Sequence, residues 1–338
     1  MKQLDLLQWP VRFDGVVSLE QTDAGVLPWR IWHEQRDLFH PDLWCRASCA
    51  SGVRIAFVSD TSTVELEIEM QGDFNTGTRI DGAFDMLVDG ELHQRFHYQV
   101  DPQPFRFENL PAGEHLIEIY LAQLPTTFVK RLAIDDNASA MPDKRQRRKW
   151  LAHGSSITHC GHAYGPSETW PALVARQFDL DLTNLGYGGQ CHADPMVARI
   201  IRDRPADYIS LCLGINIYGS LTLGPRSFRE AAIGFIKTIR DGHKHTPIML
   251  MSPIISPPRE TEPSATGITL VMMRDMLRET VDVLKRHGDE HLYYIDGLSI
   301  MGEADLDLMP DGVHPNPEGY KRMAERYAAQ AMPVLMGK

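Results

Sequence analysis

Two short stretches of the chain carry the residue types that a serine nucleophile and its base require. Residues 153–158 read His-Gly-Ser-Ser-Ile-Thr, and residues 311–317 read Asp-Gly-Val-His-Pro-Asn-Pro. An Asp three residues before a His can accept a hydrogen bond from one ring nitrogen, which leaves the other nitrogen free to take a proton from a serine. Serine-rich turns are common and a lone His is more often structural. The pairing of Asp311 with His314 nevertheless favours nucleophilic catalysis.

Two further motifs offer hydrogen-bond donors to a developing negative charge. Residues 184–189 read Asn-Leu-Gly-Tyr-Gly-Gly, and three glycines allow the backbone to approach a ligand and present N–H groups. Asn216, at the end of Leu-Gly-Ile-Asn, could aim its side-chain amide at an oxyanion. Each motif also has a plainer interpretation, as a flexible loop and as an Asn that caps a turn.

The elements expected around these motifs place them at one edge of a sheet. From about residue 149, short apolar runs alternate with helical patterns. The expected strands are 150–153, 180–185, 208–213, 248–252 and 292–295, and the expected helices lie near 168–178, 192–203, 226–241, 268–287 and 317–331. This alternation predicts a parallel sheet covered on both faces, with ligands beyond the carboxyl ends of its strands.

In the order in which they occur along the chain, the four motifs resemble the consensus blocks of the SGNH (GDSL-type) hydrolase superfamily over roughly residues 149–332. The resemblance implies an α/β fold, a flavodoxin-like three-layer α/β/α domain. It implies Ser156 as the nucleophile, His314 as its base and Asp311 as the acid that orients the base. The family's two-step acyl transfer requires neither a metal nor an organic cofactor.

The same resemblance implies an oxyanion hole made of the Ser156 and Gly189 N–H groups and the Asn216 side-chain amide. Two positions depart from the family pattern. Ser155 stands where the family usually has an acid before the nucleophile, and Ile217 stands where an acid commonly follows the block-three Asn. Neither position belongs to the triad, but the hydrogen bonds that hold the nucleophile turn must differ. The chain also lacks the G-x-S-x-G motif of α/β-hydrolases.

The N-terminal part reads as β structure. Alternating runs at 52–70, 84–88, 95–100 and 115–121 are separated by turn residues, which predicts an antiparallel, jelly-roll-like sandwich. We therefore expect a β-sandwich domain at 1–143, a basic linker at 144–149 and a hydrolase domain at 150–338. A sandwich before an SGNH domain is similar to carbohydrate esterase family 2 and related deacetylases, and also to acyltransferases that tailor polyketides. Whether the sandwich serves substrate binding or oligomerisation stays open.

Composition excludes several classes of partner. The net charge of −11 disfavours nucleic acid, and no apolar run approaches the length of a membrane span. The N-terminal residues 1–15 lack the apolar core of a signal peptide, which predicts a cytoplasmic protein. Five scattered cysteines with no export signal indicate free thiols, and Cys160 and Cys191 are expected to pack rather than react.

The leading hypothesis is a serine esterase that hydrolyses small O-acyl esters, O-acetyl above all, on a carbohydrate. The alternatives are an acyltransferase that uses the same triad and a non-catalytic carbohydrate-binding protein. Candidate substrate contacts are Tyr187, His192 and His159, and His162 also lies near the motifs. The loops beside the motifs are polar and offer no apolar trough, so acetyl esters should react faster than octanoyl esters. A homo-oligomer is not excluded.

Overall fold

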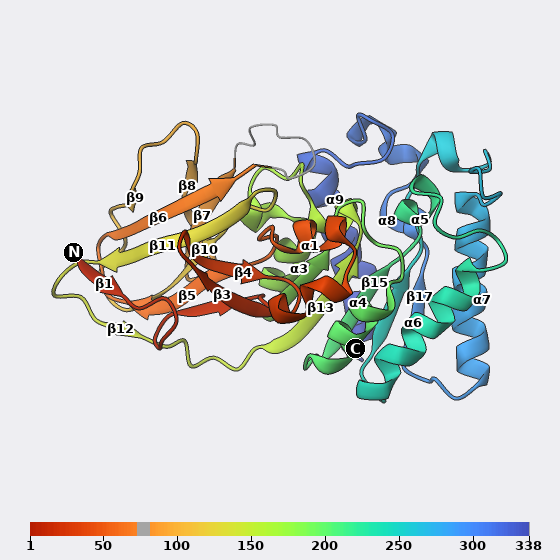
Figure 1. The fold of residues 1–338 in the computed structure, drawn as a ribbon, viewed down its shortest axis with the longest axis horizontal. Coiled ribbons are helices and arrows are strands. Elements are labelled where there is room, and N and C mark those ends of the chain that lie inside the picture. Colours follow the sequence, from red (N-terminus) through yellow and green to blue (C-terminus); the bar gives the residue numbers. More distant parts are fainter. Residues whose placement is uncertain (73–81, 338) are drawn as a thin grey trace. The chain divides into compact units, whose positions relative to one another are not determined.

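The computed structural model describes residues 1–72 and 82–337, which form two compact units (Figure 1). The β unit comprises Met1–Arg147 together with Tyr164–Ser167. The α/β unit comprises Arg148–Ala163 and Glu168–Lys338. The short segment Tyr164–Ser167 therefore packs with the β unit, although the sequence had placed it with the hydrolase half.

The β unit consists of two antiparallel sheets. One has the strand order β3-β4-β11-β6-β9, with β1 also paired to β11, and the other has the order β12-β5-β10-β7-β8, with β2 paired to β5. The strands are β1 (Lys2–Leu4), β2 (Arg12–Asp14), β3 (Ser18–Thr22), β4 (Gly25–Trp29), β5 (Arg54–Ser59), β6 (Val64–Gln71), β7 (Ala83–Val88), β8 (Glu91–His97), β9 (Phe105–Phe107), β10 (His115–Tyr120), β11 (Thr126–Ile134) and β12 (Ala140–Met141). Helix α1 (Pro41–Ala47) and a 3₁₀ helix (His33–Leu38) join β4 to β5.

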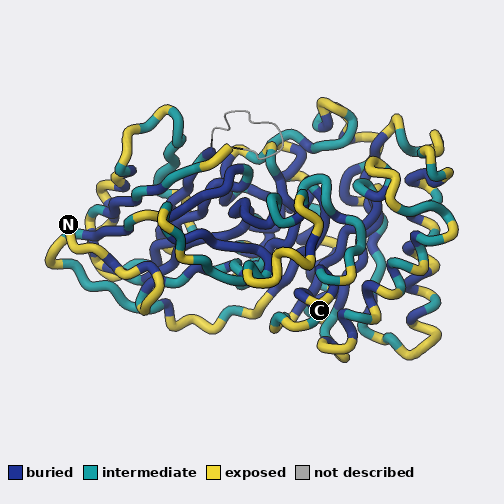
Figure 2. The backbone as a smooth tube through the Cα atoms, viewed as in Figure 1, coloured by how far each residue is buried: buried dark blue, intermediate teal, exposed yellow. Residues whose placement is uncertain are grey.

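Alternate residues of both sheets share one apolar core, as a sandwich requires. Ile55 and Phe57 of β5 lie in the same buried cluster as Val64 and Leu66 of β6. The tube view shows these strands buried and the connecting loops exposed (Figure 2). The expected sandwich architecture is confirmed.

Two carboxylates are buried in the β unit with full sets of partners. Asp85, fully buried, accepts hydrogen bonds from Arg95 Nε (2.6 Å) and Nη2 (2.9 Å) and from the Ser167 N–H (3.0 Å) and Oγ–H (2.7 Å). Glu118 lies between Arg54 and Arg147, at 3.1 and 3.0 Å. Burial would raise the pKa of Glu118, but the two guanidinium groups outweigh burial and lower it.

The α/β unit is built on a five-stranded parallel sheet with the order β14-β13-β15-β16-β17, the flavodoxin-like order. Its strands are β13 (Arg148–Gly154), β14 (Leu180–Gly186), β15 (Tyr208–Cys212), β16 (Ile248–Met251) and β17 (Leu292–Ile295). Its α-helices are α2 (Ser156–His159), α3 (Trp170–Gln177), α4 (Pro195–Asp203), α5 (Ile215–Gly219), α6 (Phe228–Gly242), α7 (Leu270–Arg286), α8 (Gly297–Ile300), α9 (Pro317–Gln330) and α10 (Met332–Leu335). Short 3₁₀ helices occupy Pro166–Glu168, Pro257–Arg259 and Glu303–Leu308.

The helices form two groups that account for the outer layers. Helices α4, α6 and α7 contact one another in series, and α3 contacts α9. All residues of β15 and β16 are buried, which is typical of strands covered on both faces. The sheet order reverses between β13 and β15, and ligands of such sheets bind at this point. The expected three-layer fold is confirmed.

One expected strand has other bounds in the structure, and one long strand was not expected from the sequence. The strand expected at 95–100 ends at His97, because residues 98–100 turn away and Val100 is 77% exposed. Strand β11 was missed because a bulge between Val129 and Arg131 interrupts the alternation that marks a strand.

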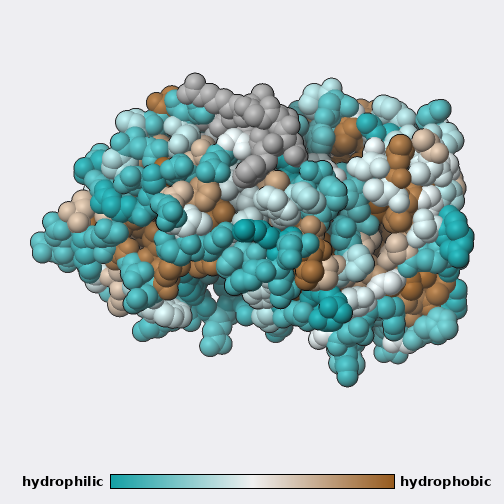
Figure 3. All heavy atoms as spheres, viewed as in Figure 1, coloured by the Kyte–Doolittle hydropathy of each residue, from teal (hydrophilic) through white to brown (hydrophobic). Residues whose placement is uncertain are grey.

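The surface is mostly hydrophilic on the face drawn in Figure 3, where apolar residues lie in separate patches. Among residues 1–72 and 82–337, no helix is both long and apolar enough to cross a membrane.

Candidate active site

Ser156, His314 and Asp311 form one continuous chain of hydrogen bonds beyond the end of β13. Ser156 Oγ lies 2.8 Å from His314 Nε2, and His314 Nδ1 lies 2.6 Å from Asp311 Oδ2. The other carboxylate oxygen, Asp311 Oδ1, accepts the backbone N–H groups of Val313 (2.9 Å) and His314 (2.7 Å). The loop therefore holds both the carboxylate and the imidazole ring in one orientation. Such an arrangement can take a proton from the serine hydroxyl.

The electrostatics of Asp311 suit an orienting acid. Partial burial would raise its pKa, but the hydrogen bonds from the His314 ring, the His314 N–H and the Val313 N–H outweigh burial. The pKa of Asp311 is therefore held well below its usual range, and the group stays ionised in neutral solution. A permanent carboxylate favours the tautomer in which His314 Nδ1 carries the proton and Nε2 faces the serine.

The two adjacent serines lie in different environments. Ser155, only 1% exposed, is the N-cap of α2, and its Oγ accepts the N–H of Ile157 at 3.2 Å. Ser156 is the first residue of the helix and is the one that reaches His314. Ser155 thus makes the local hydrogen bond that caps this turn, at the position where the family usually has an acid.

The glycine motif packs closely against the nucleophile turn. A Cβ on Gly186 would lie 2.3 Å from the His159 backbone nitrogen, so only glycine allows this approach. A Cβ on Gly188 would lie 3.8 Å from Ser156 Cβ, which places the loop beside the nucleophile. Gly189 has a φ of +75°, a conformation that glycine adopts readily. Its N–H makes no hydrogen bond within the described part of the chain.

Asn216 is oriented by a neighbour that sequence reasoning did not identify. Its Oδ1 accepts the backbone N–H of Cys191 at 3.1 Å, so the side-chain nitrogen must point the other way. Over the described residues, neither this Nδ2 group nor the Ser156 N–H has a hydrogen-bond partner. With the Gly189 N–H, three donors are therefore available for a negative oxygen.

Two of the candidate substrate contacts, His159 and Tyr187, have buried side chains. His159 is 2% exposed, and its Nδ1 accepts the Gly188 N–H at 3.3 Å. Tyr187 is fully buried and packs against the ring of His153. Neither side chain presents a surface to solvent, so both support the glycine loop from within.

The other two histidines near the motifs reach solvent, since His192 is partly exposed and His162 is exposed. His192 contacts Gly189 O through Nε2 (3.1 Å) and Thr222 Oγ1 through Nδ1 (3.1 Å). His162 lies edge-to-face against the His314 ring, with centroids 5.3 Å apart. Burial, reinforced by the charge on His314, lowers the pKa of His162. His162, which the sequence places near the motifs, is therefore the neighbour of the base.

The three cysteines of the α/β unit are unsuited to nucleophilic attack. All five cysteines are free, as expected, and burial raises the pKa of Cys160 and Cys191 and raises that of Cys212 to about 12. His153, buried beside Cys191, has its pKa lowered to about 4 by burial and remains neutral. In the regions that the structure describes, no cluster of three or more His, Cys, Asp or Glu side chains could hold a metal ion.

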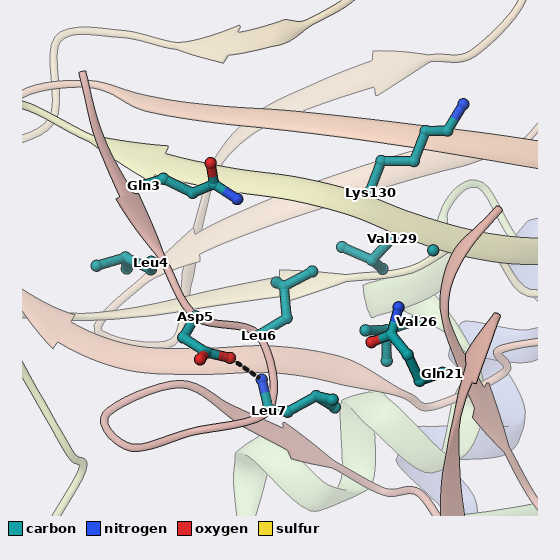
Figure 4. A pocket seen from close by; sticks show the side chains of 10 residues that line it. Gln3, Leu4, Asp5, Leu6, Leu7, Gln21, Val26, Val129 and Lys130 are labelled. Atoms are coloured by element: carbon teal, nitrogen blue, oxygen red, sulfur yellow. Dashed lines mark hydrogen bonds between the residues drawn. The ribbon is translucent and has the colours of Figure 1, made fainter. Parts of the chain in front are cut away.

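A cavity of about 410 Å³ lies in the β unit (Figure 4). It is lined by Gln3, Leu4, Asp5, Leu6, Leu7, Gln21, Gly25, Val26, Val129 and Lys130. Its charged groups are already engaged, since Asp5 accepts the Leu7 N–H at 2.9 Å and Lys130 lies 3.0 Å from Glu69. The lining contains no Ser, Cys or His, so this cavity lacks the groups that acyl transfer requires.

Comparison with known proteins supports the geometry-based assignment of the fold. Residues 147–332 match the model of the GDSL-like lipase/acylhydrolase family, and residues 11–131 match the N-terminal domain of SsfX3. No curated protein sequence matches the chain.

Three solved structures illustrate the similarity. The salicylyl-acyltransferase SsfX3 of a tetracycline biosynthetic pathway is 31% identical, with 98% of each chain covered and a TM-score of 0.91. A protein described as a GDSL-like lipase from Bacteroides ovatus is 20% identical, with 96% of each chain covered and a TM-score of 0.77. A family two carbohydrate esterase from Clostridium thermocellum is 16% identical over 97% of this chain and 99% of the other, with a TM-score of 0.68. The chain belongs to the GDSL-like lipase/acylhydrolase family.

Proposed function

We propose that this protein is a serine esterase that hydrolyses small O-acyl esters, with Ser156 as nucleophile, His314 as general base and Asp311 as the orienting acid. The observation that carries the proposal is the unbroken chain from Ser156 Oγ through His314 to Asp311, with distances of 2.8 and 2.6 Å.

The reaction proceeds in two halves. His314 Nε2 takes the proton of Ser156 Oγ as the oxygen attacks the ester carbonyl, and the resulting oxyanion is bound by Ser156 N–H, Gly189 N–H and Asn216 Nδ2. The C–O bond to the alcohol then breaks, and His314 returns the proton to the leaving alkoxide. In the second half, His314 activates water, which attacks the acyl-enzyme and releases the acid and the free Ser156.

The alcohol portion of the substrate is proposed to be a carbohydrate and the acyl portion acetyl. This choice draws on the likeness of the fold to family two carbohydrate esterases, which is a likeness of fold at 16% identity. It also draws on the polar groups near the triad, including the exposed His162 and the partly exposed His192.

Acyl transfer to an alcohol is the second candidate, favoured by the 31% identity to an acyltransferase over 98% of the chain. The two reactions share the acyl-enzyme and differ in what attacks it. Measuring products from an acetyl ester with and without an added acceptor alcohol separates them. A hydrolase releases acetate at a rate that the acceptor scarcely changes, whereas a transferase forms a new ester.

Covalent labelling tests the proposed nucleophile directly. An organophosphate should label Ser156, and Ser156→Ala should abolish both the label and ester turnover. Ser155→Ala is the matched control, because it removes a helix cap worth about 1 kcal/mol but no reacting atom. A label mapped to Ser155, or turnover that survives in Ser156→Ala, would contradict the proposal.

A further inference from the structure

A small apolar cavity of about 10 Å³ lies in the α/β unit, at the carboxyl end of β15. It is lined by Ile157, Cys212, Leu213, Ile215, Pro253, Ile254, Ile255, Ser256 and Val313. The one hydroxyl in this lining is already used, since Ser256 Oγ donates to Gly312 O (2.8 Å) and accepts from Arg259 (3.0 Å). The Cys212 thiol stays neutral because burial raises its pKa to about 12. The cavity therefore offers only apolar contact.

Three lining residues adjoin the proposed catalytic groups in the chain. Ile157 follows Ser156, Ile215 precedes Asn216, and Val313 precedes His314. The cavity is therefore lined by the residues next in sequence to the proposed nucleophile, to one proposed oxyanion donor and to the proposed base. Ile215 and Val313 are partly exposed, whereas the other lining residues are buried, so these two form the side nearest to solvent.

The lining residues Pro253, Ile254 and Ile255 are held in place by hydrogen bonds of their backbone. Arg274, 4% exposed on α7, donates through Nε to Pro253 O (2.9 Å) and through Nη2 to Ile254 O (3.1 Å). The Ile255 N–H donates to Met301 O at 3.0 Å. A backbone fixed at three successive residues resists widening of the cavity, so its size is a property of the resting protein.

We propose that this cavity receives the alkyl end of the acyl group and that Ile255, Ile215 and Val313 limit acyl length to acetyl. The inference rests on the proposed function and deepens it. A cavity of about 10 Å³ is close to the smallest that holds one water molecule, which is similar in size to a methyl group. A longer chain or an aromatic acyl group such as salicylyl does not fit, and an ionised acyl group would lose its hydration without gaining a partner.

The test is the ratio of kcat/KM for butyryl to that for acetyl p-nitrophenyl esters. The wild-type protein should prefer acetyl by at least roughly tenfold, because the two additional methylenes of a butyryl chain overpack a cavity of about 10 Å³. Where the cavity has room for them, each buried methylene is worth about fourfold. Ile255→Ala and Val313→Ala should raise the butyryl-to-acetyl ratio by about tenfold each. Val313→Ile, which adds a methylene toward the cavity, should lower acetyl turnover.

Ile248→Ala is the matched control, since Ile248 is fully buried on β16 of the same unit but does not line the cavity. It should leave the ratio unchanged. Val313→Ala keeps the test valid if Ile255→Ala fails to fold, because Val313 is partly exposed.

The outcomes separate the two proposals. An active wild-type enzyme whose ratio does not change in Ile255→Ala and Val313→Ala would overturn the acyl site and leave the esterase intact. Preference of the wild type for hexanoyl or salicylyl esters would also overturn it. Failure of the wild type to turn over any ester or to take a label at Ser156 would overturn the proposed function, and this inference with it.

Discussion

Both units hold carboxylates in short hydrogen bonds, but the groups that these carboxylates are linked to differ between the two units. In the β unit, Asp85 accepts four hydrogen bonds from Arg95 and Ser167, and Glu118 is bound between two arginines. In the α/β unit, Asp311 begins a chain that passes through His314 and ends on the Ser156 hydroxyl. A carboxylate that is bonded only to arginines and serines of its own cluster stabilises the fold, and we call such a cluster closed. A carboxylate whose chain of hydrogen bonds ends on a reactive hydroxyl can take part in catalysis, and we call such a chain open.

The largest effect should follow from breaking the open chain. Asp311→Asn keeps the shape but favours the wrong His314 tautomer, and the corresponding change in another serine hydrolase costs roughly 10⁴ in kcat. Steady-state kinetics with an acetyl ester measures the loss. Asp307→Asn, an exposed Asp in the preceding 3₁₀ helix, is the control and should be fully active. Near-normal kcat in Asp311→Asn would show that the chain is structural.

Removing an oxyanion donor should cost less. Asn216→Asp retains the oxygen that accepts the Cys191 N–H but replaces the amide donor, so kcat should fall on the order of 10²–10³ with little change in KM. Asn216→Ala removes the donor without adding a negative charge beside the oxyanion, so its kcat should fall no further than that of Asn216→Asp. A change confined to KM would make Asn216 a contact of the bound substrate instead.

The closed cluster should respond in stability, not in chemistry. Asp85→Ala leaves Arg95 and Ser167 without their acceptor and should lower the free energy of unfolding by up to about 3 kcal/mol, below the value for a fully buried pair because Arg95 is 21% exposed. Urea denaturation measures this loss, with the exposed Asp23→Asn as control. If the folded variant instead lost activity at unchanged stability, the distinction between closed and open clusters would fail.

The smallest effect should appear in the dependence of the free energy of unfolding on acidic pH. The pKa of Glu118 is lowered in the fold, so its stabilising contribution is present above the unfolded pKa and is lost as the pH falls through the folded pKa. Below about pH 4.5, the free energy of unfolding of Glu118→Gln should therefore fall less steeply than that of the wild type, by up to about 1.4 kcal/mol per pH unit. Equal slopes would mean that folding leaves the pKa of Glu118 unchanged.

Local sequence patterns predicted that Ser156, His314 and Asp311 lie together, but they did not predict the residues packed around this group. Asp311 and His314 are three residues apart, so their hydrogen bond follows from the chain itself, and the strand ends could be placed from apolar runs. The cavity brings together four distant segments, and no local pattern marks such a group. His162 lies two residues after Cys160, whose backbone is left-handed, and the sequence pattern does not predict that its ring packs against His314. His159 and Tyr187 were expected to contact the substrate because they lie close to the motifs in sequence. Closeness in sequence does not report burial, and both side chains are buried.

The segment Tyr164–Ser167 has a consequence for how such proteins can be recombined. Its residues pack with the β unit, yet they lie in sequence between α2 and α3 of the α/β unit. An exchange of modules that cuts the chain once, after Arg147, would remove both Ser167 donors from Asp85. A functional chimera must therefore transplant two pieces of chain, the first 147 residues and a four-residue graft inside the other module.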